Sequence, residues 1–288
     1  LGKIQPDLER WIADHPEWRD NVRNYCRGSF EEGLRERPIT RDLHWGVEVP
    51  LEGEEGKVFY VWFDAPIGYI SSTKEWAAAK GEPDLWKKYW CDSETKLVHF
   101  IGKDNIFFHA ILFPAMLHTH GEFVLPDNVP ANEFMNLEGQ KLSTSKNWAI
   151  WLPEYLDEFG PDLLRYYLAY VSPETHDSDF KWKEFQNIIN SHLADILGNF
   201  VNRVVSMTRR FFDGEVPVRG ELQPEDKKIV DLLAGASETV GSLHEKFHLR
   251  DATTATLELA RAGNLYVQEQ QPWKLAKENK ERCGTRSE

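Results

Sequence analysis

Cysteine is scarce in this chain and is never paired. The 288 residues include three cysteines, Cys26, Cys91 and Cys283, with no Cys-x-x-Cys pair among them. This spacing argues against a disulfide framework and against a zinc site built from thiolates. We therefore expect a chain that binds no zinc and is located in the reducing cytoplasm.

Long apolar runs and an excess of positive charge are also missing. The longest apolar stretch, 110–117, contains Pro114 and is too short to cross a bilayer, so no membrane partner is expected. Lys and Arg total 34 against 47 Asp and Glu, which gives a net charge of −13. An acidic chain is a poor general polyanion binder, so any contact with nucleic acid must use a local basic face.

Strand-like runs alternate with helical ones between residues 58 and about 150. VFYVWF and LVHFIG are rich in β-branched and aromatic residues, which is typical of strands buried on both faces. Each precedes a helical pattern, APIGYISSTKEWAAA and DNIFFHAILFPAML respectively. This order predicts a parallel α/β sheet whose ligands gather beyond the carboxyl ends of its strands.

From about residue 161 the apolar period becomes helical. A long helix is predicted over 185–211, followed by a turn at Asp213–Gly214 and a second helix with Pro224 near its first turn. A third helix is expected from about Asp251 and a fourth from Pro272. The sequence therefore predicts a helical bundle after the α/β part.

The segment KLSTSK places two ammonium groups and several hydroxyls on one loop. The pair Glu138–Gly139 is suited to a tight turn, and it is followed by Lys141, Ser143, Thr144, Ser145 and Lys146. Such groups can neutralise and hydrogen-bond a leaving pyrophosphate. A solvated polar loop would have the same composition, so the segment gains weight only from its context.

A second group of residues lies where the predicted strands end. Trp62 and Tyr69 flank the strand-to-helix corner and can form an aromatic slot for a thioether side chain, although core packing would also account for both rings. Gly102 ends the next strand and lets a ligand approach the backbone. Asp104 then caps the following helix or accepts hydrogen bonds from a ribose, and His109 lies on that helix as a pocket residue or a core histidine.

Taken together and in this order, these segments resemble methionyl-tRNA synthetases. YVWFDAPIGYI, HFIGKDNIFFHAILFPAML and QKLSTSKNWAI followed by PDLLRYYLAY carry the resemblance, which covers about residues 41–273. It implies half of a Rossmann-like parallel-sheet catalytic domain followed by an α-helical bundle. It also implies methionine, tRNA(Met) and ATP with Mg²⁺ as substrates, and no particular oligomer.

The resemblance also implies a role for each matching residue. The methionine pocket would be formed by Trp62, Ala65, Pro66, Tyr69 and His109. Gly102 and Asp104 would contact the adenylate. The loop that matches KMSKS would stabilise the triphosphate through Lys141, Ser143, Thr144 and Ser145, with Thr144 where many members carry a second lysine.

The predicted long helix offers a face for tRNA. Asn202, Ser206 and Arg210 recur at four-residue spacing, and hydrogen-bonding side chains in such a row can meet unstacked bases. Trp273 is a candidate stacking platform. In the family, positions matching Asn202, Arg210 and Trp273 contact the anticodon. A solvated helix face and a core tryptophan are the structural alternative.

Two departures from the family pattern shape the predicted domains. The HIGH motif has no match, since His118-Thr119-His120-Gly121 follows a helix instead of an opening strand, and the zinc-bearing insertion is missing. We therefore expect the end of a connective insertion at 1–57, the second catalytic half at 58–131, a stem-contact region with the lysine loop at 132–184, and the anticodon bundle at 185–288. Another class I synthetase, or a tRNA-binding module without catalysis, stays open as an alternative.

Overall fold

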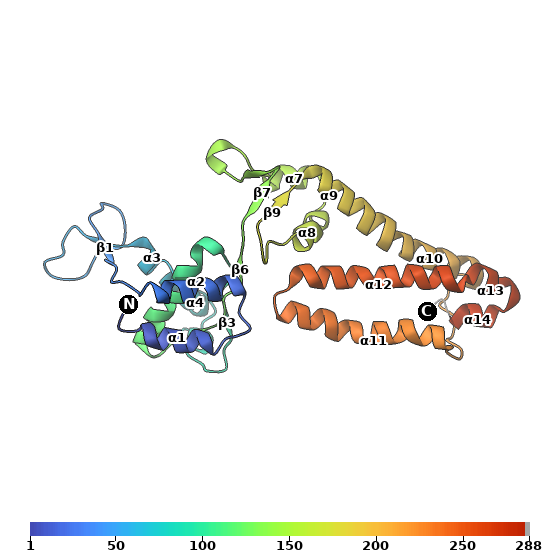
Figure 1. Ribbon diagram of the computed structural model, residues 1–288, viewed down its shortest axis with the longest axis horizontal. Helices are drawn as coiled ribbons and strands as arrows, with labels where there is room; N and C mark the ends of the chain where they lie inside the picture. Colours follow the sequence, from blue (N-terminus) through green and yellow to red (C-terminus); the bar gives the residue numbers. More distant parts are fainter. Residues whose placement is uncertain (286–288) are drawn as a thin grey trace. The chain divides into compact units, whose positions relative to one another are not determined.

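The computed structural model describes residues 1–285, which divide between Phe134 and Met135 into two compact units (Figure 1). No helix in this described range has the length and apolar character needed to span a membrane. The first unit contains both the predicted parallel strands and the predicted pocket residues. The second contains the lysine loop and the predicted bundle.

The first unit combines short helices with two-stranded sheets. Its helices are α1 (Gln5–Ala13), α2 (Asp20–Glu31), α3 (Val61–Asp64), α4 (Ile67–Ala79), α5 (Trp86–Trp90), the 3₁₀ helix η1 (Lys103–Asn105), the π-helix η2 (Phe107–Leu112) and α6 (Phe113–His120). Its strands are β1 (Thr40–Arg41), β2 (Val58–Phe59), β3 (Leu97–Val98), β4 (Ile101–Gly102), β5 (Pro126–Asn128) and β6 (Ala131–Asn132). β3 pairs parallel with β5, and β4 pairs parallel with β6, which confirms the parallel pairing expected of LVHFIG.

The prediction that VFYVWF forms one buried parallel strand is wrong. β2 ends at Phe59 and pairs antiparallel with β1, and α3 begins at Val61, whose side chain is 55% exposed. The backbone N–H groups of Phe63 and Asp64 donate to the Tyr60 carbonyl. A helical turn therefore satisfies the backbone after Tyr60, where β1 is too short to offer further strand pairing.

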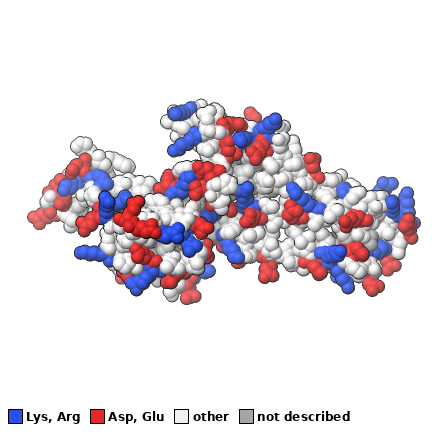
Figure 2. Space-filling model, in the orientation of Figure 1, with Lys and Arg blue, Asp and Glu red and all other residues white. Residues whose placement is uncertain are grey.

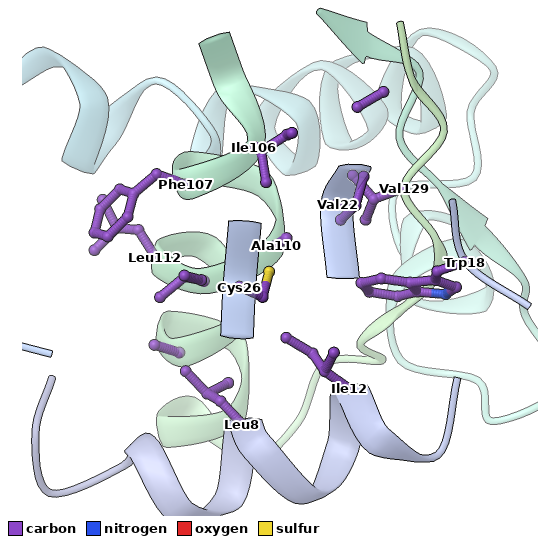
Figure 3. Close-up of a cluster of buried hydrophobic side chains, with 13 residues drawn as sticks. Leu8, Ile12, Trp18, Val22, Cys26, Ile106, Phe107, Ala110, Leu112 and Val129 are labelled. Atoms are coloured by element: carbon purple, nitrogen blue, oxygen red, sulfur yellow. The ribbon is translucent and has the colours of Figure 1, made fainter. Parts of the chain in front are cut away.

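The core of the first unit joins α1 and α2 to the π-helix η2 (Figure 3). Trp18, Val22 and Cys26 are almost fully buried against Ile106 and Ala110. The Trp18 indole N–H also donates to the Asp127 carbonyl at 2.7 Å. The intervals 1–57 and 58–131 therefore share one hydrophobic core, which holds the ends of β4 and β6 in place.

The second unit begins with a three-stranded sheet. Its order is β8 (Gln140–Lys141), β7 (Met135–Leu137) and β9 (Ser178–Phe180), with β7 antiparallel to β8 and parallel to β9. The remaining elements are helical: η3 (Thr144–Lys146), α7 (Leu152–Glu158), α8 (Pro161–Tyr170), α9 (Trp182–Ile188), the π-helix η4 (Ile189–Gly198), α10 (Asn199–Phe212), α11 (Pro224–Glu245), α12 (Leu249–Gln270), α13 (Pro272–Glu278) and α14 (Lys280–Thr285).

The predicted helices of the bundle are confirmed at their ends. α10 stops at a turn in which Asp213 and Gly214 have φ of 55° and 85°, α11 begins at Pro224, and α13 begins at Pro272. α11 and α12 lie side by side (Figure 1). The π-helical stretch η4 was not predicted, because its apolar spacing resembles that of an α-helix over so short a run.

Candidate functional site

The corner at Pro66 joins two helices, α3 and α4, instead of the strand and helix that the sequence predicted. Pro66 is buried and occupies the N-cap of α4 with φ −64°, as its fixed backbone angle favours. Ala65 is the C-cap of α3, so the two short helices meet at this pair. Trp62 stacks on Phe108 of η2, with centroids 4.4 Å apart and an interplanar angle of 14°. The structure thus gives Trp62 a stacking partner that the sequence did not indicate.

Tyr69 and His109 are brought together across 40 residues of sequence. The Tyr69 hydroxyl lies 2.9 Å from His109 Nε2, and His109 Nδ1 lies 3.1 Å from the Asn105 carbonyl oxygen. A carbonyl oxygen only accepts, so Nδ1 carries the proton and Nε2 accepts from the Tyr69 hydroxyl. His109 is 3% exposed, whereas Tyr69 is 44% exposed. The pair therefore runs from the surface into the core.

Burial keeps the imidazoles of this cluster neutral. Desolvation lowers the pKa of His109, although its bond to the Asn105 carbonyl opposes this effect. His99, whose ring centroid is 5.4 Å from that of His109, has its pKa lowered to about 4 by desolvation and by His109. A cluster without charge suits an uncharged, polarisable ligand side chain better than an ionic one.

Gly102 and Asp104 lie together where β4 ends. A Cβ atom at residue 102 would lie 2.8 Å from Asp104 Oδ1, so the glycine makes room for this carboxylate against the backbone. Asp104 lies within η1, whose N-cap is Gly102, and the N-cap of η2 is Ile106. Asp104 therefore occupies the N-cap of neither helix, and its carboxylate lies beside the strand end.

A polar network at the same strand ends was missed by the sequence analysis. Lys103 Nζ donates to Glu133 Oε2 at 2.7 Å, and Asn21 Nδ2 donates to Glu133 Oε1 at 2.8 Å. Arg19 in turn donates to Asn132 Oδ1 at 2.7 Å. The position of Lys103 between Gly102 and Asp104 could have marked it as a residue of the site. The bond between Glu133 and Asn21 of α2 is a long-range contact, which no local sequence pattern shows.

The lysine loop is an ordered hairpin in the second unit. Glu138 and Gly139 form the predicted tight turn, with φ of 50° and 76°. Two backbone hydrogen bonds of 2.9 Å join Ser143 to Trp148, and the Ser143 and Ser145 hydroxyls lie 3.2 Å apart. In Figure 2 the side chains drawn blue on the loop between β7 and α7 are lysines, since this loop contains no arginine.

An apolar cavity of about 500 Å³ lies against this loop. Leu142 and Thr144 contribute to it from the loop, and Leu164, Leu168 and Phe180 from the surrounding elements. The loop therefore presents hydroxyl and ammonium groups on an apolar support, with Lys141 at the end of β8 and Thr144 in η3.

The predicted row on α10 forms one exposed face. Asn202, Ser206 and Arg210 are all exposed, and the Ser206 hydroxyl donates to Asn202 Oδ1 at 3.4 Å. Arg203 lies over the half-buried Trp273 ring at 5.7 Å and donates to Gln268 at 3.1 Å. Arg203 therefore joins α10 to α12 and to Trp273.

Side chains that could bind a metal ion do not cluster among the residues that the structure describes. Residues 1–285 contain no group of three or more His, Cys, Asp or Glu side chains placed to hold a metal ion. The chemistry that the described residues offer is hydrogen bonding, ring contact and charge neutralisation.

Comparison with known proteins gives a consistent family. Residues 1–205 match the tRNA synthetases class I (M). The methionine–tRNA ligase of Salinibacter ruber is 54% identical over 296 residues, which cover 98% of this chain and 41% of that protein. The ligase of Porphyromonas gingivalis is 52% identical over 288 residues, which cover 99% of this chain and 42% of that protein. The chain thus spans about two-fifths of the length of these relatives.

Solved structures show the same fold. The Mycobacterium tuberculosis methionyl-tRNA synthetase in complex with methionyl-adenylate superposes with a TM-score of 0.86 at 29% identity. That superposition covers 99% of this chain and 56% of the other. The likeness confirms the predicted class, an α/β part followed by a helical bundle.

Proposed function

This chain belongs to the methionyl-tRNA synthetase family of class I, and we propose that it serves the ATP-dependent activation of methionine and its transfer to tRNA(Met) in the cytoplasm. The single observation that carries the proposal is the neutral Tyr69–His109 pair beside the Trp62 corner. It supplies aromatic surface and uncharged polar groups, as a thioether side chain requires. The relative solved with methionyl-adenylate supports the same assignment.

Activation requires little covalent chemistry from the protein. The methionine carboxylate attacks the α-phosphate of MgATP, pyrophosphate leaves, and methionyl-adenylate remains. Catalysis of this type depends on positioning and on stabilising the negative charge of the leaving group. We assign pyrophosphate stabilisation to Lys141 and to the hydroxyls of Ser143, Thr144 and Ser145 on the lysine loop.

The remaining groups of the first unit bind the two substrates. We assign contact with the adenylate to Gly102 and Asp104. The Asp104 carboxylate, which lies beside the end of β4, supports this assignment. Trp62, Ala65 and Pro66 enclose the methionine side chain together with Tyr69 and His109.

The exposed face of α10 binds the tRNA anticodon in this proposal. Asn202, Ser206 and Arg210 offer hydrogen-bond donors in one row, and Trp273 offers a ring on which a base can stack. Arg203 lies over that ring, 5.7 Å from its centroid. The net acidity of the chain restricts tRNA to such local faces.

Replacing Trp62 by alanine tests the pocket. We expect Trp62→Ala to raise the KM for methionine by about tenfold or more and to leave the KM for ATP almost unchanged, because a stacked ring beside Phe108 is lost. Trp76→Ala is the matched control, since Trp76 is 39% exposed and contacts Tyr89 and Lys80 instead. An equal rise in both KM values for Trp62→Ala would contradict the assignment.

A further inference from the structure

His99 lies behind the Tyr69–His109 pair at a position fixed by the sheet. It follows β3, and its backbone N–H donates to the Asn128 carbonyl at 3.0 Å, which continues the pairing of β3 with β5. Its side chain is 8% exposed. The imidazole is therefore held inside the first unit by the backbone that leads into Gly102.

The His99 ring contacts the rings around the proposed pocket. Its centroid lies 5.4 Å from that of His109, 5.6 Å from that of Tyr69 and 5.9 Å from that of Phe113. The centroids of Tyr69 and His109 are 5.8 Å apart although their polar atoms are hydrogen-bonded. Measured between ring centroids, Tyr69 thus lies as close to His99 as to the imidazole that it already bonds.

The Nε2 atom of His99 is buried and has no hydrogen-bond partner among residues 1–285. Buried polar atoms in proteins are normally hydrogen-bonded, and an unpaired one is costly. A phenylalanine would make the same ring contacts without that cost. The nitrogen itself therefore requires an explanation, and the nearest hydroxyl-bearing ring is that of Tyr69.

We propose that His99 is a positioning residue of the methionine pocket, whose Nε2–H donates to the Tyr69 hydroxyl oxygen when methionine binds. The Tyr69 hydroxyl keeps donating to His109 Nε2, and His109 Nδ1–H keeps donating to the Asn105 carbonyl. Each group uses one proton, so the chain of hydrogen bonds closes without proton transfer. Tyr69 is then held from two sides, which fixes the exposed part of its ring against the methionine side chain. This inference rests on the proposed function.

Two substitutions separate the nitrogen from the ring. His99→Phe keeps an aromatic ring and removes the donor, and His99→Gln restores an N–H at a similar reach. We expect His99→Phe to raise the KM for methionine about tenfold in ATP–pyrophosphate exchange, with kcat and the KM for ATP within about twofold. His99→Gln recovers part of that loss. The assay uses the complete product of the reading frame that encodes this chain.

A matched control lies in the second unit. His192 is 6% exposed and bonds the Tyr166 hydroxyl through Nδ1 at 2.9 Å, so His192→Phe also removes a buried imidazole from a Tyr–His pair. We expect His192→Phe to leave the KM for methionine unchanged.

We expect His99→Phe to melt at the same or a higher temperature than the unsubstituted protein, because the substitution removes an unpaired nitrogen. A purely structural role for His99 predicts a lower melting temperature.

Three results would overturn the inference. They are an unchanged KM for methionine in His99→Phe, a KM in His99→Gln as high as that in His99→Phe, and an equal rise in the KM for methionine and ATP. The unsubstituted protein distinguishes these from failure of the proposed function. If it shows no methionine-dependent exchange, the proposed function is contradicted, and the role of His99 falls with it.

Discussion

At the scale of single residues, the candidate site depends on histidines that remain neutral. Among residues 1–285, the Tyr69–His109 and Tyr166–His192 pairs are each joined by a hydrogen bond of 2.9 Å, and burial lowers the pKa of both histidines. The first pair adjoins the Trp62 corner and the end of β4 within the first unit. The neighbours of the pair, more than the hydrogen bond itself, therefore support the proposed methionine pocket.

The low pKa of His99 predicts a pH dependence of stability. The folded protein holds His99 with a pKa of about 4, whereas the unfolded chain titrates near 6.5. Between these values the unfolded state binds a proton that the folded state lacks, so the free energy of unfolding falls as pH drops from 6.5 to 4. The total loss from this residue is roughly 3 kcal/mol.

Urea unfolding at a series of pH values measures this effect. His99→Phe should flatten the free energy of unfolding between pH 6.5 and 4, since its ring binds no proton. Carboxylates that titrate in the same range contribute equally to both proteins, so the difference isolates His99. Parallel curves for the two proteins would show that His99 is not kept neutral by the fold.

At the scale of elements, the helices of the bundle were predictable, and the structure of the VFYVWF segment was not. The bundle depends on local patterns, an apolar period interrupted by Asp213–Gly214, Pro224 and Pro272, and the helices end or begin at those residues. VFYVWF has the composition of a strand, but β1 pairs only with Val58 and Phe59, so tertiary pairing decided its structure.

The same distinction applies to the site. Tyr69 and His109 were recognisable by the motifs that contain them, whereas their hydrogen bond spans 40 residues of sequence. The contacts of His99 and the link from Lys103 through Glu133 to Asn21 also join distant segments. No local periodicity encodes such contacts, because the fold of the first unit creates them.

The lysine loop carries a prediction about the role of its first lysine. Lys141→Ala should lower kcat for ATP–pyrophosphate exchange about 10²-fold, because an ammonium aimed at the leaving pyrophosphate acts mainly in the transition state. Lys183→Ala, at an exposed position of α9 outside the lysine loop, is the control and should have a much smaller effect. Equal losses in the two variants would contradict a specific role for Lys141.

The contact between α10 and α12 depends on a glycine. A Cβ atom at residue 263 would lie 2.5 Å from the Phe200 ring, so Gly263→Ala forces that ring, or the helix that carries it, to shift. We expect it to destabilise the protein by about 1–3 kcal/mol. Gly235→Ala in α11 is the matched control, since nothing lies within 4 Å of its Cβ position, and it should stabilise by about 0.5–1 kcal/mol.

Thermal and urea unfolding would compare the two glycine variants. A Gly263→Ala protein as stable as the unsubstituted one would show that α10 and α12 are not held in close contact. Because Trp273 is supported by Arg203 of α10, the same shift should also weaken tRNA binding by Gly263→Ala and leave it unchanged in Gly235→Ala.

At the scale of the whole molecule, two quantities bear on the proposed function: the net charge of the chain and the share of its relatives' length that it covers. Acidic residues exceed basic ones by 13, and the face in Figure 2 shows Lys and Arg interspersed with Asp and Glu. Such a surface gives a polyanion no broad attraction, so the proposed tRNA binding depends on particular groups, among which we propose Arg210. The chain spans about two-fifths of its relatives, which makes activity of the complete reading frame the relevant comparison.

Methionine-dependent ATP–pyrophosphate exchange tests the central claim most directly. It would be measured on this chain and on the complete product of its reading frame, with isoleucine, valine, leucine and cysteine as competing amino acids. The account predicts exchange with methionine in the complete product, at least about 100-fold more efficient than with the other four. Exchange with none of them, or with another amino acid in preference to methionine, would contradict it.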